Sequence, residues 1–290
     1  MIFDSLFRLT KTVDRENYGL NRYLAEIEGK LPVPKGQIAI ARDFALVLND
    51  NGHQTLIGDN DSFCQLSTNE GIVKLAATFA GYMALTRHGR IITSGKAREF
   101  ERFYYVEKLS NVKDVVATEG HIVVLFDDGT VESIDEPGGW EGIPQHHKVV
   151  KGWRDIKQVA VGFSNIMGLT EAGKVLYHSV DGYTNTHFYD NCSDVVQIDC
   201  YSHYYGTDSS AVLYKDGTVF SDTFDGVKEW SDIIQISVGD RIIVGLKRDG
   251  TIEIEGGKKS VAKEWKNLVS VECKFCRVVG ITSSGEILSC

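Results

Sequence analysis

The chain has 290 residues, of which 42% are hydrophobic and 24% are charged, with 29 glycines and only 4 prolines. This composition is typical of a globular protein and excludes a disordered or collagen-like chain. The net charge of −9 argues against a nucleic-acid partner, because an acidic surface repels a phosphate backbone. No apolar run approaches the roughly 18 residues that a spanning helix needs, so no membrane partner is expected.

Residues 1–30 are predicted to form an extension with one amphipathic helix. Its apolar positions fall at helical spacing: Leu20, Tyr23, Leu24, Ile27 and Leu31. The helix either covers one rim of the domain that follows or binds a partner. The start of the chain lacks the basic and apolar regions of a signal peptide, which predicts a cytoplasmic protein with reduced cysteines.

The rest of the chain repeats one unit, which is clearest from Trp230 to Gly256. A turn glycine recurs seven times, at Gly52, Gly89, Gly129, Gly173, Gly217, Gly250 and Gly285. Apolar residues alternate along the runs on both sides of each glycine, and such alternation predicts strands joined by a tight turn. Successive glycines lie 33 to 44 residues apart. A period near 40 residues with several strands per unit is the signature of a β-propeller.

The repeat also carries a family resemblance. The motif W-x-D-I-x-Q-I-x-x-G, followed by V-G-L-K-x-D-G-T-V, resembles the regulator of chromosome condensation (RCC-type) repeat in its short bacterial form. Residues 153–174 and 230–251 match it best. The resemblance covers roughly residues 36–290 and implies a seven-bladed propeller. The W-G-x-N-x-x-G-Q-L-G segment of eukaryotic members is absent. The family's frequent histidine, eight residues before the turn glycine, remains only as His121.

The predicted fold is therefore all-β: a seven-bladed β-propeller over residues 31–290, after the helical extension of residues 1–30. Each blade is expected to have four strands, the outermost being a short strand of the type KEW. The last repeat ends at Cys290 without such a strand. Residues near 31 to 35 are predicted to supply it, as an N-terminal strand that closes the last blade. A closed ring predicts a monomer.

Several aromatic residues stand out against this repeat. Trp153, Trp230 and Trp265 each lie three residues before the first aliphatic residue of a blade, which indicates packing between blades. The aromatic segments 99–105 and 181–190 are expected to supply third and outer strands. Trp140, in the inserted loop EPGGWEGIPQHH, either folds back onto the surface or contacts a partner.

Repeat five carries five additional residues in the segment CYSHYYGTD, between its inner and second strands. This connection is expected on a face of the ring, close to the central channel. Tyrosine-rich loops on a rigid scaffold suit contact with a partner, although the loop could instead fill the end of its own blade. The predicted partner-binding residues are Trp140, Tyr201, His203, Tyr204 and Tyr205.

The sequence shows no reaction centre. Cys273 and Cys276 form a CxxC pattern, but Cys273 falls on a small apolar position of the inner strands, where a cysteine behaves as a buried hydrophobe. His146 and His147 are adjacent and His187 lies in a neighbouring segment between blades, so a loop metal site or a catalytic base is one interpretation. With eight histidines in 290 residues, however, such a coincidence is ordinary. Since no P-loop, HExxH, G-x-S-x-G or dinucleotide fingerprint is present, no catalytic residue, metal or cofactor is predicted.

The preferred prediction is a non-catalytic protein that binds another protein through aromatic loops on one propeller face. The resemblance implies the same mode of action, because guanine-nucleotide exchange factors and propeller-type β-lactamase inhibitor proteins of this kind both bind proteins. No long wedge-like insertion supports exchange, and the missing signal peptide argues against inhibition of a secreted enzyme. The alternative is a small-ligand-binding or enzymatic propeller, which requires polar side chains that converge at the mouth of the central channel.

Overall fold

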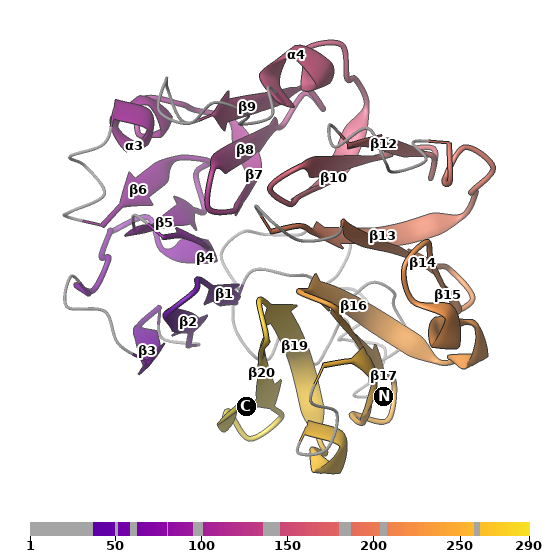
Figure 1. Cartoon of the computed structure of the whole chain (residues 1–290). Helices are drawn as coiled ribbons and strands as arrows, with labels where there is room; N and C mark the ends of the chain where they lie inside the picture. Colours follow the sequence, from indigo (N-terminus) through magenta and orange to yellow (C-terminus); the bar gives the residue numbers. More distant parts are fainter. Residues whose placement is uncertain are drawn as a thin grey trace, which may run out of the picture.

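The computed structural model describes residues 37–49, 52–58, 63–79, 81–94, 101–135, 146–179, 187–203, 208–257 and 262–290. Within these residues the chain forms seven antiparallel sheets of three strands each, arranged as a ring (Figure 1). The seven sheets, in chain order, are β1 (Ile38–Ile40), β2 (Phe44–Leu48) and β3 (Gln54–Gly58); β4 (Ile72–Thr78), β5 (Gly81–Thr86) and β6 (Ile91–Thr93); β7 (Val112–Ala117), β8 (His121–Phe126) and β9 (Val131–Asp135); β10 (Ile156–Val161), β11 (Asn165–Thr170) and β12 (Val175–Ser179); β13 (Val195–Tyr201), β14 (Ser209–Tyr214) and β15 (Val219–Ser221); β16 (Ile233–Gly239), β17 (Ile242–Lys247) and β18 (Ile252–Gly256); β19 (Leu268–Lys274), β20 (Arg277–Thr282) and β21 (Ile287–Ser289).

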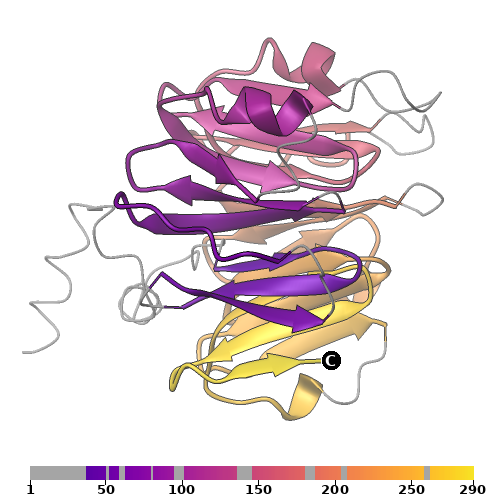
Figure 2. The same cartoon turned by 90° about the vertical axis from the view of Figure 1, so that its left-hand side faces the viewer.

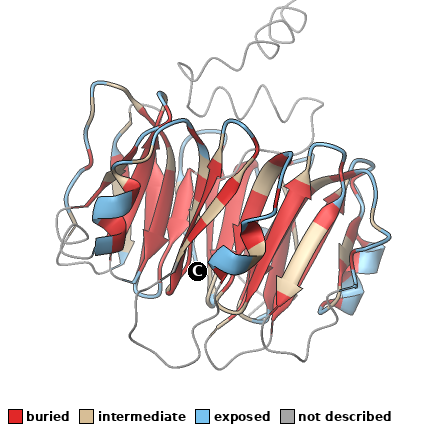
Figure 3. Cartoon of the chain, turned by 90° about the horizontal axis from the view of Figure 1, so that it is seen from above, coloured by how far each residue is buried: buried red, intermediate tan, exposed pale blue. Residues whose placement is uncertain are grey.

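These sheets are the seven blades of the predicted propeller, and the first strand of each faces the centre of the ring. Seen edge-on, the strands run from one face of the ring to the other (Figure 2). The turns with the seven glycines lie on one face, which we call the glycine face. The connections between first and second strands lie on the opposite face, which we call the insertion face because it includes the longer connection of blade five. Burial is concentrated in the strands, and exposed residues in the turns and short helices (Figure 3).

The predicted outer strands are wrong where the structure describes them. The segments after the third strands form short helices instead: α3 (Glu101–Val106), α4 (His146–Val150) and the 3-10 helices η2 (Asp225–Glu229) and η3 (Ala262–Glu264). In three of these segments an apolar residue stands three positions before a tryptophan, as Val227 does before Trp230. The Trp230 N–H donates to the carbonyl of Val227 over 3.0 Å, which is the i to i+3 bond of a 3-10 turn.

The three regularly spaced tryptophans pack between blades, as predicted. Trp230 lies in a core cluster that joins β14 and β15 to β16 and β17. Its ring rests on the glycine at the middle of the second strand, so that a Cβ on Gly245 would lie 2.8 Å from the ring. Where Leu109 takes the tryptophan's place, the facing position holds Val124 instead of glycine. In these blades a larger side chain therefore faces a smaller one, as close packing requires.

Adding the single methyl group of Gly245→Ala is therefore expected to overpack this site. We predict a loss of about 1–3 kcal/mol in the free energy of unfolding, because the Trp230 ring is buried in the core between two blades. Most of this loss should disappear in a Trp230→Leu background, where the two changes compensate each other. The control is Gly152→Ala, since a Cβ there would meet nothing within 4 Å. Urea denaturation of the wild type, the three single variants and the double variant measures the effect, and equal losses at positions 245 and 152 would contradict it.

A second set of contacts ties neighbouring blades at the glycine face. The residue before the first strand adopts left-handed backbone geometry, as in Asp155 with φ of 57° and Asp232 with φ of 59°, and Asp and Asn tolerate this geometry better than other side chains. The following N–H then donates to the turn glycine of the preceding blade, for example from Ile233 to Gly217 over 3.1 Å. The Asp-Ile pair and the turn glycine of the repeat are thus two halves of one contact between blades.

The Asp-Gly-Thr turns of blades three, five and six share a further feature. In each turn the threonine donates both its N–H and its O–H to one carboxylate oxygen of the aspartate, as Thr251 does to Asp249 over 2.9 and 2.5 Å. These hydrogen bonds lower the pKa of Asp128, Asp216 and Asp249 below the usual value of an aspartate, and the hydroxyl contributes more than the N–H.

A lowered pKa stabilises the fold only while the carboxyl is ionised. This contribution is therefore present above the unfolded pKa of an aspartate, about 4, and is lost as the pH falls through the lowered pKa of the folded state. The triple variant Asp128→Asn, Asp216→Asn, Asp249→Asn keeps the turns but removes the charge. We expect the wild type to be more stable than the triple variant at neutral pH, with the difference vanishing as the pH falls. Thermal unfolding across this range tests the prediction, and a difference that does not change with pH would contradict it.

The ring closes where blade seven meets blade one. Ile38, Ile40 and Val47 pack against Val269 and Val279, and the Arg277 guanidinium donates to the carbonyl of Ile57 over 3.2 Å. The predicted N-terminal helix, the closing strand near residues 31–35 and the boundary between residues 30 and 31 lie outside the described residues, so they stay predictions. Across the described part of the chain, no helix is long and apolar enough to cross a bilayer.

Candidate functional site: the central channel and the insertion face

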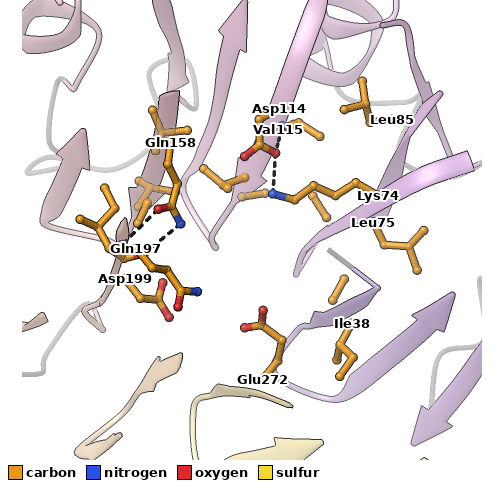
Figure 4. A pocket seen from close by; sticks show the side chains of 18 of the residues that line it. Ile38, Lys74, Leu75, Leu85, Asp114, Val115, Gln158, Gln197, Asp199 and Glu272 are labelled. Atoms are coloured by element: carbon orange, nitrogen blue, oxygen red, sulfur yellow. Dashed lines mark hydrogen bonds and ion pairs between the residues drawn. The ribbon is translucent and has the colours of Figure 1, made fainter. Parts of the chain in front are cut away.

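The first strands enclose a cavity of about 580 Å³ along the axis of the ring. Residues from blades one to five and from blade seven line it (Figure 4). Aliphatic side chains alternate there with polar ones, and the polar positions recur at the same place in each strand. Equivalent positions on the first strands therefore form two polar layers around the cavity. The first layer includes Lys74 and lies near the glycine face, and the second lies two residues further along each strand.

The first layer is built by the glutamine of the repeat motif, and it holds blades together. Gln197 accepts the N–H of Ile236 over 2.8 Å and donates to the carbonyl of the same residue over 3.3 Å. Gln158 makes the same pair of bonds to Ile198 in the next blade. Between blades two and three, an ion pair of 2.5 Å between Lys74 and Asp114 takes this place. The polar groups at this level are therefore largely used for the ring itself.

Removing one of these glutamine contacts should destabilise the whole ring. Gln197→Met keeps the length of the side chain but leaves the N–H and the carbonyl of Ile236 unpaired in a buried place. We expect the free energy of unfolding to fall by about 1–3 kcal/mol. The matched control is Gln65→Met, because Gln65 bonds the backbone of Gln54 at a partly exposed site. Denaturation curves compare the variants, and a larger loss at position 65 would refute this role for Gln197.

The second layer differs between the two halves of the ring. Blades one to four have small or aliphatic residues there, namely Ala39, Ala76, Val116 and Ala160. Blades five to seven have polar residues, namely Asp199, Ser237 and Glu272. Asp199 accepts the Val238 N–H over 2.7 Å, and Ser237 donates to Glu272 over 2.8 Å. Asp199 and Glu272 are only 7% and 8% exposed, and their carboxyl groups point into the cavity in Figure 4.

Contacts across the ring close the channel toward the insertion face. The Lys274 side chain starts on blade seven and donates to the carbonyl of Ala117 on blade three over 3.1 Å. Beyond it, Arg42 of blade one pairs with Glu119 of blade three over 2.7 Å and donates to the His203 ring of blade five over 3.3 Å. The cavity therefore opens toward the glycine face, and the centre of the insertion face is a filled surface.

The predicted partner-binding residues fall into three groups. Tyr201 is 3% exposed and packs edge-on against Phe275, and burial raises the pKa of its phenol. Because it ends β13, Tyr201 belongs to the strand and the core rather than to an exposed loop. His203 lies on the insertion face beside Arg42. Trp140, Tyr204 and Tyr205 lie outside the described residues, and a role for them in binding stays a prediction.

Three phenylalanines on the insertion face were missed by the sequence prediction. Phe79, Phe163 and Phe275 each stand ten residues before a turn glycine, where blades one, three and six have Arg42, Glu119 and Asp240. Phe79 is 54% exposed. The sequence signal that could have found these phenylalanines is their constant distance from the turn glycine. Apolar alternation does not reveal them, because they lie in the connection after the first strand.

The base of the long connection in blade five is held by polar contacts to blade four. The carboxylate of Asp208 accepts hydrogen bonds from the hydroxyls of Ser164 and Ser179. Ser202 accepts the N–H of Ser164 over 2.7 Å. Both ends of the connection are thus fixed to a neighbouring blade, which suits a loop that presents side chains from a rigid base.

The histidines and cysteines singled out in the sequence are not brought together. His146 and His121 are buried side by side, and both direct Nε2 at the carbonyl of Phe163. His187 pairs instead with Asp190 over 2.7 Å. Cys273 is buried on β19, as its register predicted, whereas Cys276 is exposed. In the described ranges, no group of three His, Cys, Asp or Glu side chains could hold a metal ion.

Segments 99–105 and 181–190 also differ from the prediction where the structure describes them. Residues 101–106 form α3, in which Phe103 is buried while Tyr104 and Tyr105 are exposed. Tyr189 is buried in a turn and donates to Ser210 over 2.8 Å. These aromatics therefore cover the outer edges of their blades without adding strands to them.

The comparisons with known proteins concern the fold. No protein-family model matches the sequence, and no curated protein sequence matches it. The structure is similar to the CRINKLY WD40 ectodomain of the Arabidopsis thaliana receptor kinase ACR4, with a TM-score of 0.65 and 11% identity over 88% of this chain and 94% of that chain. It is also similar to Prp20p from Saccharomyces cerevisiae, with a TM-score of 0.58 and 16% identity over 90% of this chain and 84% of that chain.

A third similar structure is human WBSCR16, with a TM-score of 0.56 and 14% identity over 87% of this chain and 88% of that chain. At such low identities the likeness concerns the fold and leaves the activity open. Together with the seven sheets of the ring, it identifies the chain as an all-β, seven-bladed β-propeller.

Proposed function

We propose that this chain is a non-catalytic scaffold of RCC-type repeats that binds another protein through its insertion face. The observation that carries the proposal is that three phenylalanines occupy the same place of the repeat in three blades of the insertion face. They lie around the end of the channel that Arg42, Glu119 and Lys274 close. Aromatic residues and arginine are enriched at the energetic centres of protein interfaces. A filled, aromatic surface on a stiff ring suits a protein partner better than a small molecule.

The long connection of blade five adds to the same surface. His203 joins it to Arg42, and Asp208 anchors its other end to blade four. Tyr204 and Tyr205 lie between these two anchors in the sequence, so we propose them as partner contacts along with His203. Tyr201 contributes by holding Phe275 in place. Trp140 is kept as a second proposed contact, in the inserted loop between blades three and four.

The similarity to Prp20p supports this proposal only as an analogy. Prp20p has binding properties to Gsp1p and histones, so a protein with a similar fold binds other proteins. We propose that the partner is another protein, and that neither a nucleic acid nor a membrane is a partner. The closed ring is proposed to act as a cytoplasmic monomer.

The alternative, a small-ligand-binding propeller, is favoured by one specific observation. Polar side chains from blades two, three, four, five and seven converge on one cavity, including Lys74, Asp114, Gln158, Asp199 and Glu272 (Figure 4). The cavity opens toward the other face, so both functions can exist in one molecule.

Crosslinking from defined positions distinguishes the two faces. A photo-reactive amino acid at position 79 places the probe on the insertion face, and one at position 248 places it on the glycine face, where Arg248 is exposed. In the native host we expect the position 79 probe to capture one specific protein, identified by mass spectrometry, that the position 248 probe does not capture. Capture from position 248 alone would place the interface on the wrong face and sink the proposal.

The identified partner, once purified, allows a direct measurement of affinity. We expect Phe79→Ala and the pair Tyr204→Ala, Tyr205→Ala each to weaken binding about tenfold or more, as for residues at the centre of an interface. The matched control is Phe188→Ala, because Phe188 is an exposed aromatic between blades four and five. If the control weakens binding as much as Phe79→Ala, the insertion face is not the specific site.

A further inference from the structure

We infer that the central cavity binds a small aliphatic carboxylate, whose charged end pairs with the Lys157 ammonium group at the glycine-face mouth. The cavity volume of about 580 Å³ falls within the range of about 300–1,000 Å³ that is usual for small-molecule sites. The site is separate from the proposed protein-binding surface, since the Lys274 side chain crosses the channel between the two. The inference therefore goes beyond the proposed function and does not depend on it.

A β-bulge near the start of the first strand decides which side chains reach this mouth. In blades two to seven the pairing of the first and second strands shifts by one residue there, for example between Ile156 and Gln158 in blade four. A bulge re-aims the extra residue relative to the rest of the strand. The extra residues of blades three, four and five line the cavity. In chain order the six extra residues are Val73, Lys113, Lys157, Val196, Ile234 and Val269.

The packing of the ring does not require a lysine at the bulge. Val73, Ile234 and Val269 are buried there, each in a hydrophobic core between two blades. Lys113 and Lys157 take the same place in two neighbouring blades, and both line the cavity. Two positive charges therefore stand at the mouth in positions where other blades of the same ring have an aliphatic side chain.

The two lysines differ in what compensates their charge. Lys113 pairs over 3.4 Å with Glu171, which stands two residues before the turn glycine of the next blade. The same place in the blade after Lys157 holds Lys215, a residue of the same charge as Lys157. Lys157 is half-buried, and its ammonium group makes no ion pair or hydrogen bond with the described residues. A bound anion would supply for Lys157 the opposite charge that Glu171 supplies for Lys113.

The sum of the charges at this end of the cavity also favours an anion. Lys113 and Glu171 offset each other, and so do Lys74 and Asp114 in the first polar layer. Lys157 is the remaining charge among the residues that line this end. A single excess positive charge suits a ligand with one negative charge better than a neutral molecule or a cation.

The wall of blades two to four suits an aliphatic chain. Ala76, Val116 and Ala160 hold the second-layer places of these blades and line the cavity, and the small alanines leave space open beside them. Asp199 and Glu272 stand on blades five and seven, where they are hydrogen-bonded into the ring. An apolar wall with a charged group at a fixed place is the usual design of a site for a small organic ligand.

Three probes of equal chain length test the charge of the ligand: hexanoate, hexylamine and hexan-1-ol. Isothermal titration calorimetry on the full chain should show that hexanoate binds at least about tenfold more tightly than the amine or the alcohol, because only the carboxylate pairs with Lys157. Acetate and butanoate then measure the contribution of the apolar wall. The affinity should rise with chain length, by up to about fourfold for each methylene group that the wall covers.

Variants locate the carboxylate of the ligand. Lys157→Met removes the ammonium group and should weaken hexanoate about tenfold or more. Lys215→Glu places an acid where the preceding blade has Glu171, so it offers Lys157 an internal partner and should also weaken hexanoate. Glu171→Gln releases Lys113 and should strengthen hexanoate about two- to fivefold. The matched control is Lys174→Met, because Lys174 is exposed and does not line the cavity. Thermal unfolding confirms that each variant is folded.

Several results would overturn the inference. These are the absence of hexanoate binding to the folded wild type at millimolar concentrations, equal affinity for hexylamine or for acetate, and unchanged binding in Lys157→Met. A loss in Lys174→Met as large as that in Lys157→Met would overturn it as well. None of these results bears on protein binding at the insertion face, because the crosslinking from position 79 does not involve the cavity. The two proposals therefore fail independently.

Discussion

Hydrogen bonds between neighbouring blades are the constraint on which the rest of this structure depends. A three-stranded blade exposes the inner edge of its first strand, and an edge without partners is unstable and prone to pair with other chains. The glutamine of the repeat motif satisfies part of that edge from the neighbouring blade, as Gln197 does for Ile236. The Asp-Ile pair does the same at the glycine face, and the tryptophans fill the space between the sheets. A residue is therefore repeated in the sequence where it contacts the next blade.

This requirement also separates structural residues from those available for function. The glutamine, the turn glycine and the Asp-Ile pair are engaged in holding the ring, so changes there affect stability first. Two places of the repeat are not needed for contacts between blades in every blade. One is the second polar layer, where alanine in blades one, two and four coexists with acids in blades five and seven. The other is the connection that includes Phe79, Phe163 and Phe275. The two proposed sites lie at the places where the blades are free to differ.

The sequence was informative where one physical reason acts in every blade. The turn glycine needs positive φ, so seven glycines gave seven blades, and the tryptophan needs a small facing residue, so its regular place indicated packing between blades. The prediction failed where the three-dimensional neighbour decides. Tyr201 belongs to a tyrosine-rich segment, yet it continues β13 and is covered by Phe275. The KEW segments alternate like strands, yet the apolar residue three positions before the tryptophan forms a 3-10 turn. The cavity could not be seen in the sequence, because Asp199 and Glu272 are 73 positions apart and line one cavity only when the blades are arranged as a ring.

Lys274 and Phe275 connect the two proposed sites through a single peptide bond. The side chain of Lys274 forms the floor of the cavity, while the ring of Phe275 packs on Tyr201 at the insertion face. Lys274 also donates to the carbonyl of Ala117 on blade three, so the contact that closes the channel and the connection that carries Phe275 share one stretch of backbone. Substitutions at Lys274 and Phe275 are therefore expected to be coupled rather than additive.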